Sequence, residues 1–416
     1  MADRVLIIGG GVIGLCCAYY CARDGAAVTI LEREVIGAGS SGENAGLVVP
    51  SHFIPLAAPG AMMQGLKWML NSESPFYIKP RFDTELISWL LKFRKAATER
   101  QARAAMPLLR DLAWKSLRLY EQLSGEEHLE FGFQKRGLLM LYATATGEHA
   151  CRHEADLARQ IGVEAEVLDR SRLEELEPHA SFGAAGGVYY PGDAHLSPSA
   201  FLGVITHRLR EMGVTILPGT VVLGIDGNGT RGTTVRTSSG VYEADVCVIA
   251  GGAWSHRLVH DLRVNLPLQP GKGYSVTINR PSLRLTIPSI LTEAHIAVTP
   301  LGNQLRLAGT MELAGHDLSI NMRRVDAIIR AVPRYYPGFA PAAADREHPW
   351  RGLRPCSPDG LPYLGRLRSY RNLIVATGHA MVGMSLGPVT GTLVADLVAG
   401  RSPSIDIGLL EPERFS

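Results

Sequence analysis

Residues 5–32, VLIIGGGVIGLCCAYYCARDGAAVTILE, decide the fold of this chain. They read as an apolar strand, a glycine-rich turn into a helix, and a second apolar strand. Gly9 permits the tight turn, Gly11 lets a pyrophosphate approach the backbone, and Gly14 lets the helix pack close to the strand. The stretch therefore predicts a dinucleotide-binding βαβ unit rather than a glycine-rich turn without a ligand.

An acidic residue stands where such a unit needs one. Glu32 ends the second strand, so its carboxylate can accept hydrogen bonds from ribose hydroxyls and disfavours a 2′-phosphate. The helix opening at Val12 and Ile13 directs free N–H groups and its positive dipole end at the pyrophosphate. The fingerprint alone leaves open whether the dinucleotide is FAD or NAD, since both share the half that it binds.

The composition is that of an ordinary globular protein. Its 416 residues are 46% hydrophobic and 20% charged, which is enough for two domains with sizeable cores. A formal net charge of +2 provides no field of the kind that nucleic-acid binding requires. The basic stretch 92–103 is expected to be a solvated helix face. We therefore expect a small-molecule partner and no nucleic acid.

The six cysteines include no Cys-x-x-Cys pair, and three of them lie on the first expected helix. This spacing predicts neither a metal site nor a disulfide framework, and it favours a reducing, cytoplasmic compartment. Residues 5–22 are apolar enough to resemble a signal or membrane segment. The glycine fingerprint inside them favours a buried strand and helix, so we expect neither export nor a transmembrane span.

Small residues dominate 36–50, which is too polar for a core segment and is expected to wrap a ligand. Apolar positions at helical spacing between 83 and 123 predict an insertion of two or three helices interrupted at Pro107. Further elements are expected as strands at 138–142, 214–217, 221–225 and 235–237, and as helices at 146–160 and 199–212.

The run 242–250 is apolar enough for one buried parallel strand, and short β-like runs within 262–345 predict an antiparallel sheet over the ligand, followed by a helix at 321–332. A late strand at 372–379 and a glycine-punctuated helix at 383–400 indicate a discontinuous nucleotide domain. We therefore predict an α/β fold with a cofactor domain and a second α+β domain. The cofactor domain is assigned 1–60, 145–260 and 346–416, and the substrate domain 61–144 and 261–345.

Four segments together resemble the FAD-dependent amine-oxidising superfamily of D-amino-acid oxidase, glycine oxidase and sarcosine oxidase. They are the fingerprint with Glu32, the loop 40–46, the run VIAGGAWS at 248–255, and a C-terminal set of GLRP at 352–355, PDGLPYLG at 358–365 and ATGH at 376–379. The resemblance implies a Rossmann-like FAD-binding domain of the GR2 type and a substrate domain built on an antiparallel sheet. It also implies that the dinucleotide is FAD.

Within this superfamily, NAG at 44–46, PLAAPG at 55–60, KWM at 67–69 and KGYS at 272–275 are similar to bacterial D-amino-acid dehydrogenases and D-hydroxyproline dehydrogenases. The resemblance implies oxidative deamination of a D-amino acid, with D-proline and D-hydroxyproline among the candidates. It further implies hydride transfer from Cα to flavin N5 once the amine is neutral, without a strong protein base. The electrons would pass to a quinone or respiratory carrier.

The resemblance also implies which residues contact the flavin cofactor. They are Gly9, Gly11, Val12, Ile13, Gly14, Glu32, Arg33, Ser40, Ser41, Asn44, Ala45, Gly46, Leu47, Val222, Ala250, Gly251, Trp254, Gly378, His379, Val382, Gly383 and Met384. At the strand-to-helix junction near His379, backbone N–H groups and a helix N-terminus would stabilise the anionic reduced flavin. The alternative role for His379 is that of a hydrogen-bonded core histidine.

For the substrate carboxylate, the resemblance points to Arg354, whose guanidinium can hold a planar carboxylate in a bidentate manner. Its alternative is a buried structural ion pair. Tyr274 is expected to add a phenolic hydrogen bond, a role for which Tyr335 and Tyr336 compete, and His52 and Tyr336 are expected in the substrate pocket. Lys272 is expected to solvate a strand edge rather than face the flavin.

Several alternatives stay open at the level of sequence. A glycine or sarcosine oxidase shares every motif but reduces oxygen, and a flavin-carrying subunit of a larger dehydrogenase would be inactive alone. Cys356 lies where sarcosine oxidases attach flavin, although its spacing differs, so we expect non-covalent FAD with Cys356 as a packed thiol. The apolar cluster at 62–70 is expected to form core or a lid rather than a membrane contact. A peripheral position on the inner membrane face, a homo-oligomer and a partner subunit remain open.

Overall fold

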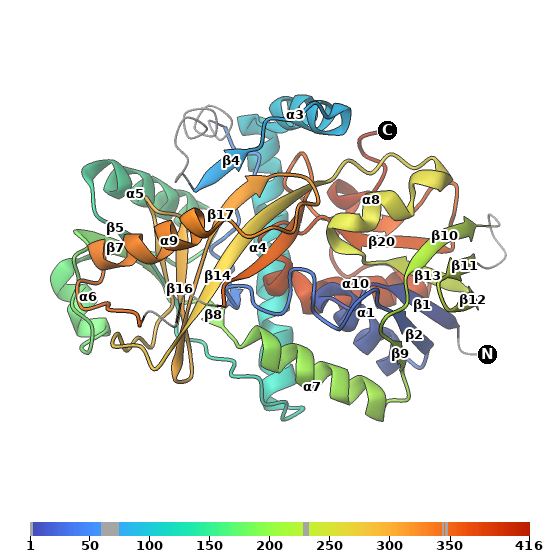
Figure 1. Ribbon diagram of the computed structural model, residues 1–416, viewed down its shortest axis with the longest axis horizontal. Helices are drawn as coiled ribbons and strands as arrows, with labels where there is room; N and C mark the ends of the chain where they lie inside the picture. Colours follow the sequence, from blue (N-terminus) through green and yellow to red (C-terminus); the bar gives the residue numbers. More distant parts are fainter. Residues whose placement is uncertain (1–2, 60–74, 228–232, 343–344, 346–347) are drawn as a thin grey trace.

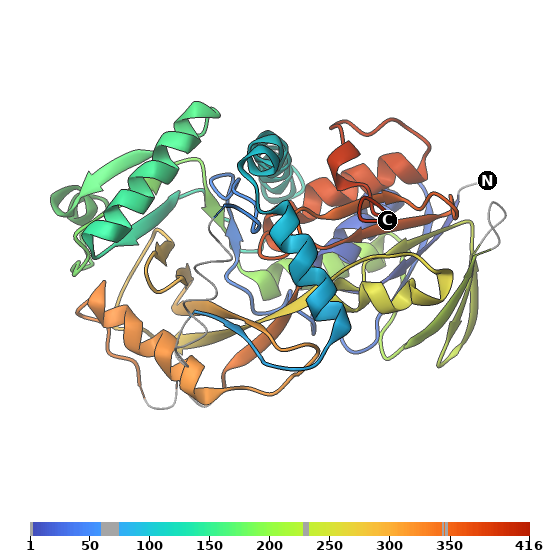
Figure 2. The same ribbon diagram turned by 90° about the horizontal axis from the view of Figure 1, so that it is seen from above.

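The computed structural model describes residues 3–59, 75–227, 233–342, 345 and 348–416. Two sheets organise this part of the chain, a six-stranded sheet near both termini and a nine-stranded sheet at the other end (Figure 1). Helix α4 (Glu99–Gly125) runs between them and packs against α10 (Gly383–Val398). Seen from above, the loop that follows β2 runs between the two halves (Figure 2). The predicted α/β architecture with a second α+β part is confirmed.

The six-stranded sheet has the order β19-β20-β13-β1-β2-β9 and is parallel except for β19. Its strands are β1 (Arg4–Ile8), β2 (Ala27–Leu31), β9 (Thr215–Leu217), β13 (Val246–Ile249), β19 (Tyr363–Arg366) and β20 (Leu373–Thr377). Alternate residues of β1 enter two different cores. Val5 and Ile7 pack under the helices, whereas Leu6 and Ile8 face the opposite core. Both faces of the six-stranded sheet are therefore covered, which fits the continuous apolar run of β1.

Helices α1 (Val12–Arg23), α10 and α7 (Pro198–Glu211) cover one face of this sheet. An ideal Cβ at Gly391 of α10 would lie 2.5 Å from the carbonyl oxygen of Cys16, so a glycine is what lets α1 and α10 approach this closely. The other face is covered by a three-stranded sheet and short helices. These are β10 (Val222–Gly227), β11 (Thr233–Thr237), β12 (Gly240–Ala244), η1 (Gly252–Trp254), α8 (Ser255–Leu258) and η2 (His260–Leu262).

The nine-stranded sheet has the order β18-β14-β17-β16-β15-β5-β7-β6, with β4 also paired to β17. Its strands are β4 (Phe76–Ile78), β5 (Leu138–Tyr142), β6 (Glu166–Asp169), β7 (Gly186–Tyr190), β14 (Gln269–Asn279), β15 (Ser289–Leu291), β16 (Ile296–Leu301), β17 (Gln304–Leu313) and β18 (Trp350–Cys356). The pairs β15–β5 and β17–β4 are parallel, and the other pairs are antiparallel. The antiparallel sheet expected within 262–345 is confirmed.

Helix α9 (Met322–Ala331) packs on one face of this sheet, and α5 (Ala145–Gln160) packs on β5 and β7 within a separate core. The remaining elements are β3 (Leu47–Val48), α3 (Thr84–Ala96), α6 (Arg170–Leu176), β8 (Ala194–His195), η3 (Val332–Arg334) and η5 (Gly408–Leu410). Among the described residues, no helix is long and apolar enough to span a membrane. The apolar cluster predicted at 62–70 lies outside the described residues.

Three expectations about elements need correction. Pro107 does not interrupt a helix but lies inside α4, where it is exposed, so that water can reach the carbonyl that lacks an N–H donor. The run 242–250 is not one strand. It divides at Asp245 into β12, which pairs in the three-stranded sheet, and β13, which pairs with β1 and β20. The predicted domain division places β6, β7 and β18 in the cofactor half, yet all three pair within the nine-stranded sheet.

Candidate functional site

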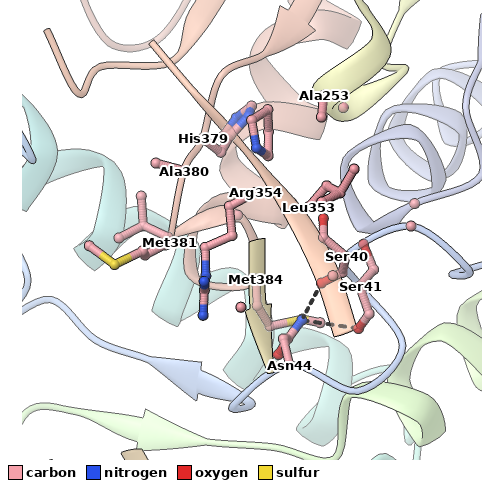
Figure 3. Close-up of a pocket in the computed structure, with 18 of the residues that line it drawn as sticks. Ser40, Ser41, Asn44, Ala253, Leu353, Arg354, His379, Ala380, Met381 and Met384 are labelled. Atoms are coloured by element: carbon pink, nitrogen blue, oxygen red, sulfur yellow. Dashed lines mark hydrogen bonds between the residues drawn. The ribbon is translucent and has the colours of Figure 1, made fainter. Parts of the chain in front are cut away.

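A cavity of about 1020 Å³ runs from the glycine fingerprint to the antiparallel sheet. Its lining includes Gly9 and Gly11 at one end, the loop 37–47, and Gly273 and Arg354 from β14 and β18. This volume reaches the upper end of the range usual for small-ligand pockets, about 1,000 Å³. Figure 3 shows Asn44, Arg354, His379 and Met384 around this pocket, contributed by segments that lie far apart in the sequence.

The glycine fingerprint is shaped as the sequence predicted. Gly9 has φ +116 and packs so closely on Ala250 that a side chain would strike the carbonyl of that residue. A Cβ at Gly14 would overlap the carbonyl oxygen of Gly9, so Gly14 serves helix packing and does not itself line the cavity. Val12 and Ile13, at the start of α1, do line it. At Gly9 and Gly11, where no side chain intervenes, the backbone thus faces the place where a pyrophosphate is expected.

Glu32 is held in one position by two backbone donors. Its Oε2 accepts a 2.7 Å hydrogen bond from Gly10 N–H, and its Oε1 accepts a 2.8 Å bond from Glu34 N–H. The carboxylate lines the cavity, where its remaining lone pairs can accept ribose hydroxyls. The guanidinium of Arg33 lies 4.2 Å from the ring centre of Trp254, and both residues line the same end. Val222, Gly251 and Ala250 line it as well.

The loop after β2 is a preformed wall. Val12 N–H donates to Ser41 Oγ at 3.0 Å, which ties the loop to the start of α1. The side chain of Asn44 spans a turn. Its Nδ2 donates to the carbonyl of Ser41 at 3.0 Å (Figure 3), and its Oδ1 accepts from Gly46 N–H at 2.8 Å. Ser40, Ala45 and Leu47 also line the cavity. The two hydrogen bonds of the Asn44 side chain therefore fix the backbone turn of this loop.

Two contacts fasten this loop to the antiparallel sheet. Ser275 Oγ donates to the carbonyl of Glu43 at 2.8 Å, and Arg306 Nη1 donates to the carbonyl of Asn44 at 3.2 Å. Arg306 is buried, so these bonds are shielded from water. No local pattern in the sequence points to Arg306, since its role depends on a loop 262 residues away.

The start of α10 forms another wall of the cavity. Val382, Gly383 and Met384 line it, and no side chain caps this helix end. His379 is buried, and its Nε2 lies 2.9 Å from Thr390 Oγ1, whereas its Nδ1 has no partner within the described residues. Burial lowers the pKa of His379 to about 3, so the imidazole is neutral. Gly378, with φ +79, makes the bend before it without lining the cavity.

Arg354 places a guanidinium inside the cavity. Its Nη1 donates a 2.9 Å hydrogen bond to the carbonyl of Thr310, a non-glycine residue with φ +68 beside a bulge between β14 and β17. No ion pair joins Arg354 to a carboxylate in the part of the chain that the structure describes, and burial lowers its pKa. A desolvated cation without an anionic partner is suited to a carboxylate ligand.

Tyr274 borders the cavity, but its hydroxyl does not meet Arg354. Arg354 lies directly opposite Gly271 on β14, so it shares a face with Gly271 and Gly273, while Tyr274 points to the other face. There its hydroxyl donates to Glu312 Oε2 at 3.1 Å. Lys272 points the same way and lies 3.3 Å from Glu312. It is buried, and therefore neither faces the flavin site nor solvates a strand edge.

Tyr336 does not line the cavity, contrary to the sequence prediction. It is fully buried in the core beneath α9, where its hydroxyl donates to Ser289 Oγ at 2.8 Å and its ring packs on Phe182. Tyr335 is likewise buried and donates to Glu293 at 2.6 Å. Neither tyrosine therefore competes with Tyr274 for the substrate carboxylate, because both hydroxyls are bonded inside the core.

His52 lines the cavity, and its Nδ1 lies 3.2 Å from Ser51 Oγ. Burial lowers its pKa to about 4. Cys356 is fully buried and does not line the cavity, and burial raises the pKa of its thiol to about 12. Among the described residues, no group of three or more His, Cys, Asp or Glu side chains is arranged to hold a metal ion.

Comparison with known proteins bears on the family and the fold of the chain. Residues 4–397 match the DAO family model, described as FAD dependent oxidoreductase. The chain is 34% identical to the D-amino acid dehydrogenase of Granulibacter bethesdensis, covering 99% of this chain and 100% of that one. It is also 34% identical to that of Methylobacterium radiotolerans, covering 97% of each.

Solved structures share the fold over the whole length. The glycine oxidase of Geobacillus kaustophilus superposes with a TM-score of 0.79 at 26% identity, covering 99% of each chain. The L-proline dehydrogenase of P. horikoshii superposes with a TM-score of 0.72 at 19% identity, covering 100% of this chain and 98% of that one, which shows the fold alone. The chain belongs to the DAO family of FAD-dependent oxidoreductases.

Proposed function

We propose that this protein is a D-amino-acid dehydrogenase that oxidises the Cα–N bond of its substrate. The observation that carries the proposal is Arg354, a half-buried guanidinium in the cavity with no carboxylate partner in the described part of the chain. An amino acid supplies the missing carboxylate. The names of the relatives that match nearly the whole chain support the choice of substrate class.

Arg354 orients the substrate. The hydrogen bond to Thr310 occupies one N–H group and fixes the plane of the guanidinium, which leaves other N–H groups to hold both carboxylate oxygens. Holding the carboxylate in this way sets the direction of the Cα–H bond and makes the reaction effectively unimolecular. Tyr274 is not needed for this role, because its hydroxyl is bonded on the other face of the sheet.

The residues present fit FAD. The glycine turn at 9–11 would receive the pyrophosphate, Glu32 the ribose hydroxyls, and the open start of α10 the pyrimidine edge of the flavin. The buried Nδ1 of His379, which has no hydrogen-bond partner among the described residues, is a further polar atom near the start of α10. When bound, FAD supplies the two-electron acceptor for the substrate. We propose that it is bound non-covalently, since Cys356 is packed away from the cavity.

The cavity beside Arg354 favours a compact apolar substrate. Phe76 of β4 pairs with Met311 of β17, and both line the cavity next to Thr310. Such a wall suits an aliphatic or cyclic side chain, so D-proline and D-hydroxyproline are the first substrates to compare with D-alanine.

We further propose that electrons leave to a quinone or respiratory carrier at a membrane surface. Helix α3 supports this, since Ile87 and Leu91, one turn apart, are exposed together with Lys95. An apolar stripe with basic neighbours suits the surface of an anionic bilayer. Flotation with vesicles containing anionic lipid tests the contact: the protein should float, and Leu91→Ser should not.

The function is tested by adding substrates to the purified holoprotein. D-Proline, D-hydroxyproline, D-alanine, their L-enantiomers, glycine and sarcosine are mixed with it without oxygen, and loss of the flavin absorbance is followed. Bleaching by D-substrates without peroxide in air supports the dehydrogenase. Peroxide with glycine or sarcosine would make it an oxidase, and no bleaching would favour a subunit that is inactive alone.

A pair of variants tests the role of Arg354. Arg354→Met should lower kcat/KM by about 100-fold or more, because a charge-assisted bidentate contact is lost. Arg351→Met is the matched control. Arg351 lies on the same strand but on the opposite face, where it donates to the carbonyl of Leu318, so its loss should leave kcat/KM within about twofold.

A further inference from the structure

A buried carboxyl group lies behind the cavity wall. Asp193, between β7 and β8, is 1% exposed and does not line the cavity. Its Oδ1 accepts a 3.1 Å hydrogen bond from Ser51 N–H, and its Oδ2 accepts the hydroxyl proton of Ser51. No ion pair joins it to a cation in the described ranges of the chain. A buried carboxylate without a cation is costly, which calls for a reason beyond packing.

Ser51 connects this carboxyl group to the cavity through His52. The hydroxyl of Ser51 has a single proton, and it donates that proton to Asp193. At 3.2 Å from Ser51 Oγ, the Nδ1 of His52 must then carry a proton and donate it. The other ring nitrogen, Nε2, is left unprotonated on a side chain that lines the cavity. The chain of contacts thus presents a proton acceptor to the site.

The surroundings of Asp193 set the pH range in which its carboxyl group loses its proton. Burial raises its pKa to about 7, although the two bonds from Ser51 act in the opposite direction. Other titratable groups of the elements around it are Tyr189 and Tyr190 on β7, His195 on β8, Arg136 before β5 and Glu154 on α5. Arg136 is the cation among these, and it adds to burial, the larger cause, in lowering the pKa of His195.

We propose that His52, Ser51 and Asp193 form a proton relay that takes up the proton of the substrate ammonium before oxidation. This inference rests on the proposed function. The proton passes from nitrogen to His52 Nε2, the Nδ1 proton passes to Ser51 Oγ, and the Ser51 proton passes to Asp193. One N–H bond of the ammonium breaks and one O–H bond forms on Asp193, without redox change. The substrate becomes a neutral amine, and the proton is stored out of water.

A purely structural role for Asp193 makes a different prediction. In that role the carboxylate only fixes the loop at Ser51, and an asparagine could replace it. Asparagine can accept from Ser51 N–H and donate to Ser51 Oγ, so Asp193→Asn preserves the loop. Ser51 then donates to His52 Nδ1, the proton sits on Nε2, and the relay has no acceptor at its end.

The first test is the pH dependence of flavin reduction in anaerobic stopped-flow mixing with saturating D-proline or D-alanine. The wild-type rate should rise between pH 6 and 8, near the pKa of about 7 of Asp193. Asp193→Asn should be about 10- to 100-fold slower at pH 7 and approach the wild type above pH 10, where the free ammonium loses its own proton. Ser51→Ala should behave in the same way, and Ser51→Thr, which keeps the hydroxyl, should restore the wild-type profile.

Asp226→Asn is the control, because Asp226 pairs with Arg236 at the surface and should leave the profile unchanged. Equal slowing of Asp193→Asn at every pH, or an unchanged profile, would overturn the relay. If no amino acid bleaches the flavin of the wild type, the proposed function fails. The substrate ammonium is then not the proton donor of the relay.

A second test does not depend on oxidation. Nitrogen-15 chemical shifts of the His52 ring, assigned by comparison with His52→Gln, report which nitrogen carries the proton. Between pH 5 and 9 the proton should move from Nε2 to Nδ1 in the wild type and stay on Nε2 in Asp193→Asn. A tautomer that does not change with pH in the wild type would contradict the relay, whatever the substrate.

Discussion

The guanidinium of Arg354 occupies the space that a side chain at position 273 would fill. An ideal Cβ at Gly273 would lie 2.5 Å from Cζ of Arg354, and both residues lie on the cavity face of the β14–β18 pair. The lack of a side chain at Gly273 thus makes room for the guanidinium of Arg354, and the hydrogen bond to the carbonyl of Thr310 fixes the direction of that guanidinium.

Gly273→Ala should therefore displace Arg354 while leaving the fold intact. The dissociation constant of a carboxylate ligand, measured by flavin absorbance, should rise about 10-fold or more, equivalent to about 1.4 kcal/mol. The melting temperature should change little, because a flexible side-chain tip can move. Gly203→Ala in α7, where nothing lies within 4 Å, is the control. An unchanged dissociation constant in Gly273→Ala would contradict this account.

Glu32→Gln should weaken FAD binding. Both carboxylate oxygens accept backbone N–H groups, and an amide nitrogen would oppose one of these donors. We expect a loss of about 1–3 kcal/mol in FAD binding free energy, measured by quenching of FAD fluorescence on titration of the apoprotein. Glu99→Gln, at the exposed start of α4, should bind FAD as the wild type does. Equal affinity of the Glu32 variant would refute the role of these two bonds.

Gly391→Ala should destabilise the protein by about 1–3 kcal/mol, because the added methyl group meets the backbone of α1 rather than a movable side chain. Thermal unfolding of the holoprotein measures this. Gly125→Ala, near the end of α4 with open space around it, should be neutral or slightly stabilising. A stable Gly391 variant would show that α1 and α10 can separate without cost.

Asp193→Asn should change the pH dependence of stability. The folded pKa of Asp193 is raised from 3.8 to about 7, so its contribution to stability is present at low pH and is lost as pH rises through about 7. The variant should therefore be more stable than the wild type at pH 8, by an amount on the order of a few kcal/mol, and lose this advantage by pH 4. Melting temperatures across this range measure the effect, and a difference independent of pH would argue against it.

Acid precipitation should release all the flavin into the supernatant. The thiol of Cys356 is fully buried, and its pKa is raised to about 12, so it is neither placed nor ionised for attachment to the cofactor. Flavin absorbance that stays with the precipitate, and disappears from it in Cys356→Ala, would reverse this conclusion.

Structural features that depend only on residues close together in the sequence were predictable. The strand, turn, helix and strand of residues 5–32, with Glu32 at the end, need only neighbours in sequence to define their geometry. The expectation for Pro107 was wrong, because α4 continues through this residue, which faces water that can hydrate the carbonyl left without an N–H donor. Tyr274 and Tyr336 were misplaced for a related reason, since strand register and core packing decide where a hydroxyl points.

The sequence by itself determined the dinucleotide unit and the family resemblance, because each depends on residue types at short, fixed spacings. The resemblance in turn pointed to Arg354, the residue that we propose for the substrate carboxylate. Tertiary structure decided the rest of the site. It placed the guanidinium of Arg354 against Gly273 and bonded Arg306 to the carbonyl of Asn44 in the loop after β2. It also brought Ser51 into hydrogen-bond contact with Asp193, 142 residues away in the chain. Contacts of this kind arise from the pairing and burial of distant segments, and no local spacing in the sequence encodes them.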